Sequence, residues 1–179
     1  MKLSIFQVDA FTTKVFAGNP AAICPLESWL PDSTMQKIAA ENNLSETAFF
    51  VPVKNNRFHL RWFTPDKEVD LCGHGTLATA FVIFNELGFS EDSIIFETLS
   101  GELIVTRQNN LLTMDFPLRE PTLCKNFSEL EKILDMEIED TLQFSDKFLV
   151  VVKDADAIKN LKPDFSALAR YDVGALILT

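Results

Sequence analysis

The chain has 179 residues, of which 47% are hydrophobic and 23% charged, with 6 Gly, 8 Pro and 3 Cys. This composition is typical of a globular protein and excludes a disordered, fibrous or disulfide-stapled one. The formal net charge of −10, without a cluster of Lys or Arg, argues against nucleic acid and an anionic membrane surface as partners.

The first 42 residues predict two strands and a helix. Apolar side chains cluster at 3–11 and 21–26 on either side of the breaker Gly18-Asn19-Pro20, which indicates strand, loop and strand. Helical spacing of apolar residues after Pro31 predicts a helix that ends near Asn42.

Two strands follow near 46–53 and 57–64, joined by a turn at 54–56. Apolar and polar residues alternate in the second strand, as expected for a strand with one buried face. The inward positions are Phe58, Leu60 and Trp62, and the outward positions include His59 and Arg61.

The segment 73–87 predicts a helix with almost no polar face, and a helix that is apolar all round is expected to be buried on all sides. A single sheet that curls around this helix would bury it. Short strands near 93–97, 101–107 and 111–116 supply the rest of that sheet, so the predicted fold class is α+β.

After Pro117 the pattern starts again, which predicts an N-terminal domain at 1–117 and the start of a second, similar domain at 118–179. We expect a helix near 128–135 and a short one near 155–160, with strands near 140–144 and 147–153. The chain ends on the apolar run 174–178, and a bare hydrophobic strand needs a partner at its edge. We therefore expect that the chain stops inside the second domain.

The segment 70–76 (Asp-Leu-Cys-Gly-His-Gly-Thr) places two glycines, a thiol and an imidazole at the start of the apolar helix. Glycine lets a ligand approach the backbone closely, and the first-turn N–H groups with the helix dipole form a local anion site. An acidic protein needs such donors to hold an anionic substrate. The alternative is that Gly73 and Gly75 serve only the turn, while Cys72 and His74 fill the interior.

Glu46 places a carboxylate at the entry to an otherwise apolar strand. Apolar walls disfavour the charged form of a carboxyl group and suit it to general acid or base catalysis. The alternative is a solvated residue at the start of a strand. Asn19, in the breaker sequence, either faces a ligand or simply belongs to a turn.

The cysteines Cys24, Cys72 and Cys124 are odd in number and far apart, without a Cys-x-x-Cys pair. With only His59 and His74 to join them, disulfides and a structural zinc site are not expected. The start of the chain does not have the apolar core of a signal peptide. We therefore predict a cytoplasmic protein with reduced thiols, without a metal and without a membrane span.

Five stretches of the sequence together are similar to one known family. They are VDAF (8–11), FAGNPAA (16–22), NLSETAF (43–49), LRWFTP (60–65) and DLCGHGTLA (70–78). In this order they resemble the phenazine-biosynthesis, PhzF-like isomerases and epimerases, which have the diaminopimelate-epimerase-like fold. The resemblance covers nearly the whole chain, densely to about Phe116.

The resemblance implies a fold of two similar domains, each a mixed sheet wrapped around a central helix, with the active site in the cleft between them. It also implies a homodimer and a cofactor-independent isomerase or epimerase that moves a proton between carbons of a small carboxylated metabolite. Glu46 matches the catalytic acid/base, and His74 matches a residue that binds the anionic substrate or assists the proton shuttle. The expected substrate-binding residues are Asn19, Asp70, Cys72, Gly73 and Gly75.

The sequence departs from the family pattern in two places. Gly75 stands where many members have alanine, a change that we expect to matter little. The second half of the family carries its own helix-start motif, an Asp-Pro followed by a Gly-Ser-Ala-His-like turn, and 118–179 has nothing similar. The resemblance therefore implies a complete first domain and a truncated second one.

Two other functions are compatible with the sequence. Related amino-acid epimerases and racemases place a cysteine at the matching turn, so Cys72 is a candidate thiol base. A non-catalytic fragment or remnant that keeps the fold is the other possibility.

Overall fold

The computed structural model describes residues 2–116, 118–124, 127–171 and 173–179. The chain divides into two units, Met1–Phe116 and Pro117–Thr179. In the described part of the chain, none of the helices has the length and apolar character needed to cross a membrane.

The first unit is built on one curled, mixed sheet. Its strands are β1 (Phe6–Ala10), β2 (Asn19–Pro25), β3 (Glu46–Lys54), β4 (Arg57–Phe63), β5 (Glu68–Val69), β6 (Ser93–Thr98), β7 (Gly101–Gln108) and β8 (Leu111–Asp115). The order is β1-β2-β3-β4-β6-β7-β8, and the short β5 pairs with β4. The pairs β2–β3 and β4–β6 are parallel, and the other neighbours are antiparallel.

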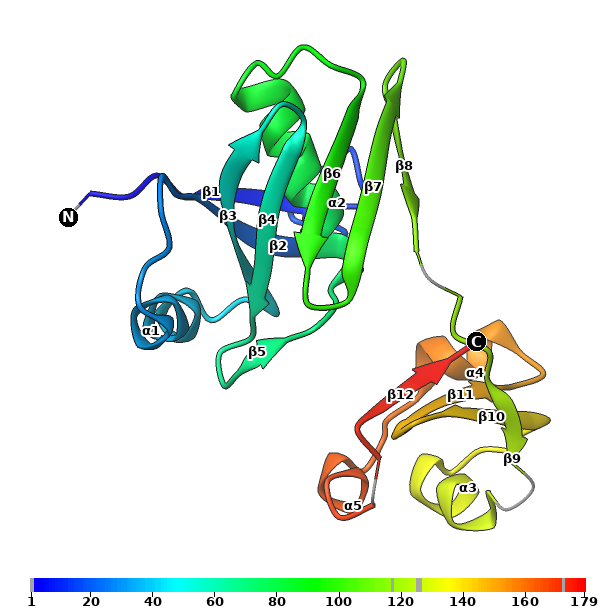
Figure 1. Cartoon of the computed structure of the whole chain (residues 1–179). Coiled ribbons are helices and arrows are strands. Elements are labelled where there is room, and N and C mark those ends of the chain that lie inside the picture. The colour runs from blue at the N-terminus through cyan, green and yellow to red at the C-terminus, as the bar shows by residue number, and fades with distance from the viewer. Residues whose placement is uncertain (1, 117, 125–126, 172) are drawn as a thin grey trace. The chain divides into compact units, whose positions relative to one another are not determined.

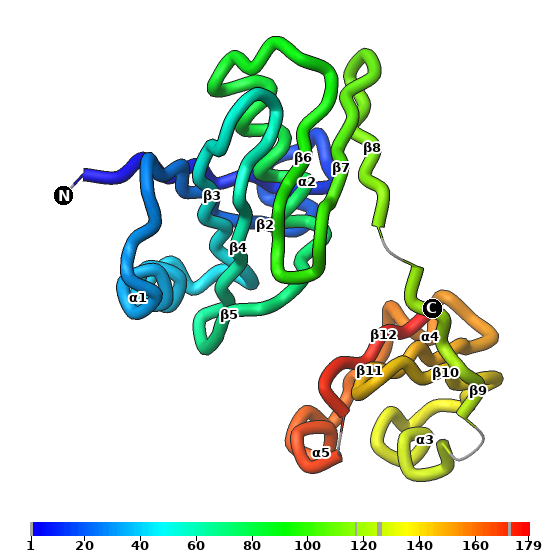
Figure 2. The backbone as a smooth tube through the Cα atoms, viewed as in Figure 1, coloured from blue at the N-terminus to red at the C-terminus, as the bar shows by residue number. Residues whose placement is uncertain are grey.

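The helix α2 (Gly73–Phe81) lies inside the curve of this sheet and continues into the π-helical turn η1 (Val82–Glu86). In Figure 1, β6 and β7 pass on one side of α2 while β1 and β2 pass on the other, and Figure 2 shows the same path of the backbone. Apolar side chains of the inner face and of the helix form one core cluster. The predicted α+β fold, with a sheet wrapped around a central helix, is therefore confirmed.

The helix is less deeply buried than its sequence predicts. Phe81 is 40% exposed, and Leu87, just after the π-helical turn, is 48% exposed. The reason is that β1 and β8 form the two edges of the sheet, so the sheet does not close around the helix. One side of α2, including Phe81, lines a hollow of about 700 Å³ between the β1 end and the β7–β8 turn.

The outer face of the sheet carries the second helix of this unit, α1 (Asp32–Asn42). Met35 and Ala39 of α1 pack against outward residues of β2, β3 and β4, including Phe49 and Phe63. The predicted alternation in β4 is confirmed, because its inward residues lie in the core cluster around α2 and His59 is exposed. The inward residues are Phe58, Leu60 and Trp62.

The second unit is a small four-stranded sheet with short helices. It contains β9 (Thr122–Cys124), α3 (Ser128–Leu134), β10 (Asp140–Phe144), β11 (Lys147–Val151), α4 (Ala155–Asn160), α5 (Phe165–Leu168) and β12 (Ala175–Leu178). The strand order is β12-β11-β10-β9, so the apolar run near the C-terminus forms an edge strand parallel to β11. The sequence analysis did not predict β9 and α5, because elements of three and four residues are too short to show a periodicity.

Candidate active site

Glu46 and His74 meet although 27 residues separate them in the sequence. Oε2 of Glu46 lies 3.1 Å from Nε2 of His74, and the two side chains are only 19% and 10% exposed. Glu46 is the first residue of β3, and His74 is the second residue of α2. The site therefore forms where the start of a strand reaches the N-terminus of the enclosed helix.

The parallel pairing of β2 with β3 brings Asn19 close to this point. Ala21 of β2 lies opposite Glu46 of β3, so the beginnings of both strands lie at the same edge. Asn19 accepts a hydrogen bond at Oδ1 from the hydroxyl of Ser45, at 3.2 Å. Asn19 thus contacts the neighbour of Glu46 and helps to hold the start of β3.

Cys72 is the N-cap residue of α2. Its extended backbone (φ −142°, ψ 112°) ends the preceding segment, and its sulfur accepts a hydrogen bond from the backbone N–H of Gly75 at 3.3 Å. The hydroxyl of Thr76 donates to the carbonyl of Cys72 at 2.6 Å. A side chain that accepts from the third residue of a helix satisfies one of its free N–H groups. The sulfur performs this role here in place of the usual oxygen.

The thiol of Cys72 also touches the imidazole. Its sulfur lies 3.5 Å from Nδ1 of His74, on the ring edge opposite the nitrogen that faces Glu46. Burial, together with the negative charge of Glu46, raises the pKa of Cys72 to about 12, although the N–H of Gly75 acts in the other direction. The thiol therefore keeps its proton at neutral pH.

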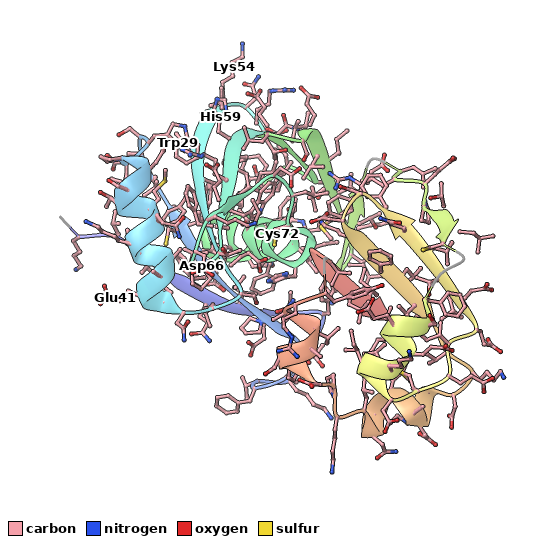
Figure 3. All side chains as sticks on the ribbon, turned by 90° about the horizontal axis from the view of Figure 1, so that it is seen from below. Trp29, Glu41, Lys54, His59, Asp66 and Cys72 are labelled. Carbon is pink, nitrogen blue, oxygen red and sulfur yellow. The ribbon has the colours of Figure 1, made fainter. Side chains whose placement is uncertain are left out.

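Glu46, His74 and Cys72 form one cluster at the start of α2. In Figure 3, Cys72 lies near the middle of the first unit and His59 lies well away from it. Ligand atoms of these three residues lie within 4.8 Å of one another, a spacing that a metal ion could also use. A cysteine binds metals as the thiolate, so a metal at this place would have to displace the proton of Cys72.

Three buried polar atoms near the start of α2 do not complete a hydrogen bond. They are Oε2 of Glu46, Nε2 of His74 and Nε1 of Trp62. The first two are close enough for a hydrogen bond, but the N–H of the ring does not point along the line that joins them. In enzymes without substrate, catalytic hydrogen bonds are often poorly aligned and tighten when substrate binds.

The two glycines of the turn differ in their surroundings. A Cβ on Gly75 would lie 2.9 Å from Cδ1 of Trp62 and 3.0 Å from the sulfur of Cys72. A Cβ on Gly73 would meet only Cζ of Phe116, at an ordinary 3.8 Å. A Cβ at position 75 would therefore require Trp62, which is 1% exposed, or the sulfur of Cys72 to shift, which argues against the expectation that alanine would matter little there.

Trp62 is a contributor to the site that the sequence analysis did not identify. Its position on the inner face of β4 was predicted, but its contact with the glycine turn depends on the curl of the sheet. Asp70 is exposed, and its backbone carbonyl accepts a hydrogen bond from the hydroxyl of Ser100 at 2.8 Å.

A curled mixed sheet around a central helix is the diaminopimelate-epimerase-like fold. The same fold is present in a predicted epimerase of Pseudomonas aeruginosa, which is 20% identical, with a TM-score of 0.79 over 99% of this chain and 70% of the other. At this level of identity the similarity concerns the fold alone.

The chain belongs to the phenazine biosynthesis-like protein family, whose model matches residues 8–179. It is 50% identical to an uncharacterized isomerase of Pseudomonas aeruginosa over 168 residues, which are 94% of this chain and 64% of the relative. A crystal structure of a PhzF-family protein from Enterococcus faecalis is 44% identical, with a TM-score of 0.90 over 99% of this chain and 68% of the other. A mouse phenazine biosynthesis-like domain-containing protein is 46% identical over 149 residues, 79% of this chain and 51% of the relative.

The chain thus spans about two thirds of the length of the bacterial relatives and about half of the mouse protein. Bacterial relatives carry the name isomerase. The family resemblance that the motifs indicated is confirmed, and the isomerase class is supported by these names.

Proposed function

We propose that this chain supplies the acid/base half of a cofactor-independent isomerase or epimerase that acts on a small carboxylated metabolite. The observation that carries the proposal is the 3.1 Å approach of Glu46 to His74 in a nearly buried position. In this proposal, the carboxylate of Glu46 takes a proton from a carbon next to an electron-withdrawing group. The resulting carboxylic acid then returns a proton to another carbon, or to the other face of the same carbon.

The start of α2 suits an anionic substrate. The N–H of Gly75 is capped by Cys72, but the positive end of the helix dipole still favours negative charge at this point. The helix carries no acidic residue in its first turn that would compete with the substrate. His74, in that turn, is the proposed second group, which binds the substrate or carries a proton between it and Glu46.

The cysteine-based alternative is less well supported by the site. A thiol base must be deprotonated to accept a proton, and the pKa of Cys72 is raised to about 12. In the structure its sulfur caps the start of α2 and lies beside the imidazole of His74. Glu46 is therefore the better candidate for the base.

The test is a deuterium-uptake screen on the protein. Small carboxylic acids with an activated C–H are incubated in D2O, and deuterium incorporation is followed by NMR or mass spectrometry. We expect Glu46→Gln to lower incorporation by roughly 100-fold or more, the usual contribution of a general acid or base. The matched control is Glu41→Gln, because Glu41 lies on the exposed surface of α1, away from Cys72 in Figure 3.

If Glu46→Gln retains the incorporation rate of the Glu41→Gln control, Glu46 is not the acid/base residue. If both variants lose activity and also unfold earlier in urea, the loss reflects stability. Glu46→Asp separates the loss of an acid/base group from the loss of stability, because it keeps the carboxyl group but moves it away from His74.

A further inference from the structure

The structure points to a specific task for Cys72, which the proposed reaction does not use directly. We propose that Cys72 is a positioning residue. Its neutral thiol donates a hydrogen bond to Nδ1 of His74 and so keeps the hydrogen of the imidazole on Nε2, the nitrogen near Glu46. The importance of this for catalysis rests on the proposed function, but the tautomer of His74 can be measured without any substrate.

The hydrogen bond that the sulfur accepts allows its own proton to point to the imidazole. The N–H of Gly75 already donates to the sulfur at 3.3 Å, so the sulfur acts as an acceptor toward the helix. At neutral pH the sulfur bears a proton, since burial raises the pKa of Cys72 to about 12. Nδ1 of His74, at 3.5 Å, is within hydrogen-bonding reach of that proton. A thiol is a weak donor, but a buried one still gains from an acceptor.

The opposite edge of the imidazole favours the same tautomer. Nε2 lies 3.1 Å from an oxygen of Glu46. A neutral imidazole has one nitrogen that donates and one that accepts. When the accepting nitrogen faces the thiol, the nitrogen that carries the hydrogen is the one near the carboxylate. Its partial positive charge is attracted to that oxygen even though the N–H does not point directly at it. The reverse tautomer would place a lone pair of Nε2 against the oxygen of an ionised carboxylate.

Two competing arrangements use the same three residues. In one, Nδ1–H of His74 donates to the sulfur and a protonated Glu46 donates to Nε2. In the other, the thiol donates to Glu46, which also contributes to the raised pKa of Cys72. The proposed arrangement differs from both in two respects together: the hydrogen of His74 is on Nε2, and it stays there because the thiol donates to Nδ1. The outer partner of a functional histidine commonly determines its tautomer in this way.

The experiment is NMR of the chain labelled with 15N-histidine. The chain has two histidines, so the ring nitrogens of His74 can be assigned by difference with His74→Gln. The spectra are recorded near neutral pH, with EDTA to exclude bound metal. His59 is the internal control, because it lies on the outer face of β4 with a side chain that is 46% exposed, near Glu97.

We expect His74 to show a protonated Nε2 and a hydrogen-bonded, unprotonated Nδ1. Cys72→Ala removes the donor and should shift the tautomer ratio toward Nδ1–H by roughly fivefold, the effect of one net hydrogen bond. Cys72→Ser keeps an O–H donor of similar position and should restore the ratio of the unsubstituted chain. The His59 signals should not change in either variant.

A dominant Nδ1–H tautomer in the unsubstituted chain would overturn the proposal. It would also fail if Cys72→Ala left the His74 ratio unchanged, which is the result expected if the thiol donates to Glu46. If Cys72→Ala does not fold, the unsubstituted chain and Cys72→Ser still decide the question. If His74 carries its proton on Nε2 but Glu46→Gln is still active, only the proposed reaction is refuted. If His74 carries its proton on Nδ1 and Glu46→Gln is inactive, only the role of Cys72 is refuted.

Discussion

Alanine at the two glycines of the α2 start should have opposite effects on stability. Both residues lie in the first helical turn, where replacing Gly by Ala gains roughly 0.5–1 kcal/mol through the unfolded chain. At Gly73 this gain is kept, because the new Cβ meets only Phe116 at 3.8 Å. At Gly75 the Cβ would lie 2.9 Å from the ring of Trp62 and 3.0 Å from the sulfur of Cys72.

Overpacking of a well-packed interior costs about 1–3 kcal/mol, so G75A should be less stable than G73A by about that amount. Urea unfolding followed by tryptophan fluorescence is the suitable assay, since the chain has two tryptophans, Trp29 and Trp62, and both lie in the first unit. Equal midpoints for the two variants would show that Trp62 and the sulfur can move aside at little cost. That result would refute the argument that the packing around Trp62 requires glycine at position 75.

Two further predictions concern stability. Burial raises the pKa of both Cys24 and Cys72 from 9.0 to about 12, so the folded chain binds more protons than the unfolded chain between these values. The free energy of unfolding should be unaffected below pH 9 and fall above it by up to roughly 1.4 kcal/mol per pH unit for each thiol. Urea titrations at pH 8 to 10.5 test this. C24A should halve the slope of the unfolding free energy against pH, and a free energy that does not change with pH would contradict the prediction. Arg61 bonds both oxygens of Glu68 at 2.7 Å and Asp32 at 2.9 Å, so R61A should cost roughly 1–3 kcal/mol by fluorescence-detected unfolding. R61K should recover only part of this loss, because lysine cannot make the two-pronged contact, and full recovery would refute the role of that geometry.

Much of the fold could be predicted because the deciding signals are local. The alternation of apolar residues in β4 and the breaker between the first two predicted strands reflect the geometry of the strands themselves. The long apolar run after Gly73 indicated an enclosed helix, and the sheet does curl around it. What this run could not show is that Phe81 lies at the opening between the edges of the sheet, because closure depends on how β1 and β8 end relative to each other.

The candidate site was predicted residue by residue, but its geometry was not. Family motifs pointed to Glu46 and His74 separately, whereas their 3.1 Å approach follows from the parallel pairing of β2 with β3 and from the position of α2 inside the sheet. The contact of Trp62 with Gly75 was not predicted for the same reason. Pairings between distant segments leave no periodic signal in either segment.

The sequence by itself determined the α+β class, the family, and the residue types at the start of α2, because composition, periodicity and short motifs are properties of neighbouring residues. Only the tertiary structure decided that the thiol of Cys72 is buried against His74, and that Gly75 packs closely against Trp62. Burial and contact between segments depend on how the sheet curls. The protonation of Cys72 and the orientation of His74 follow from that curl.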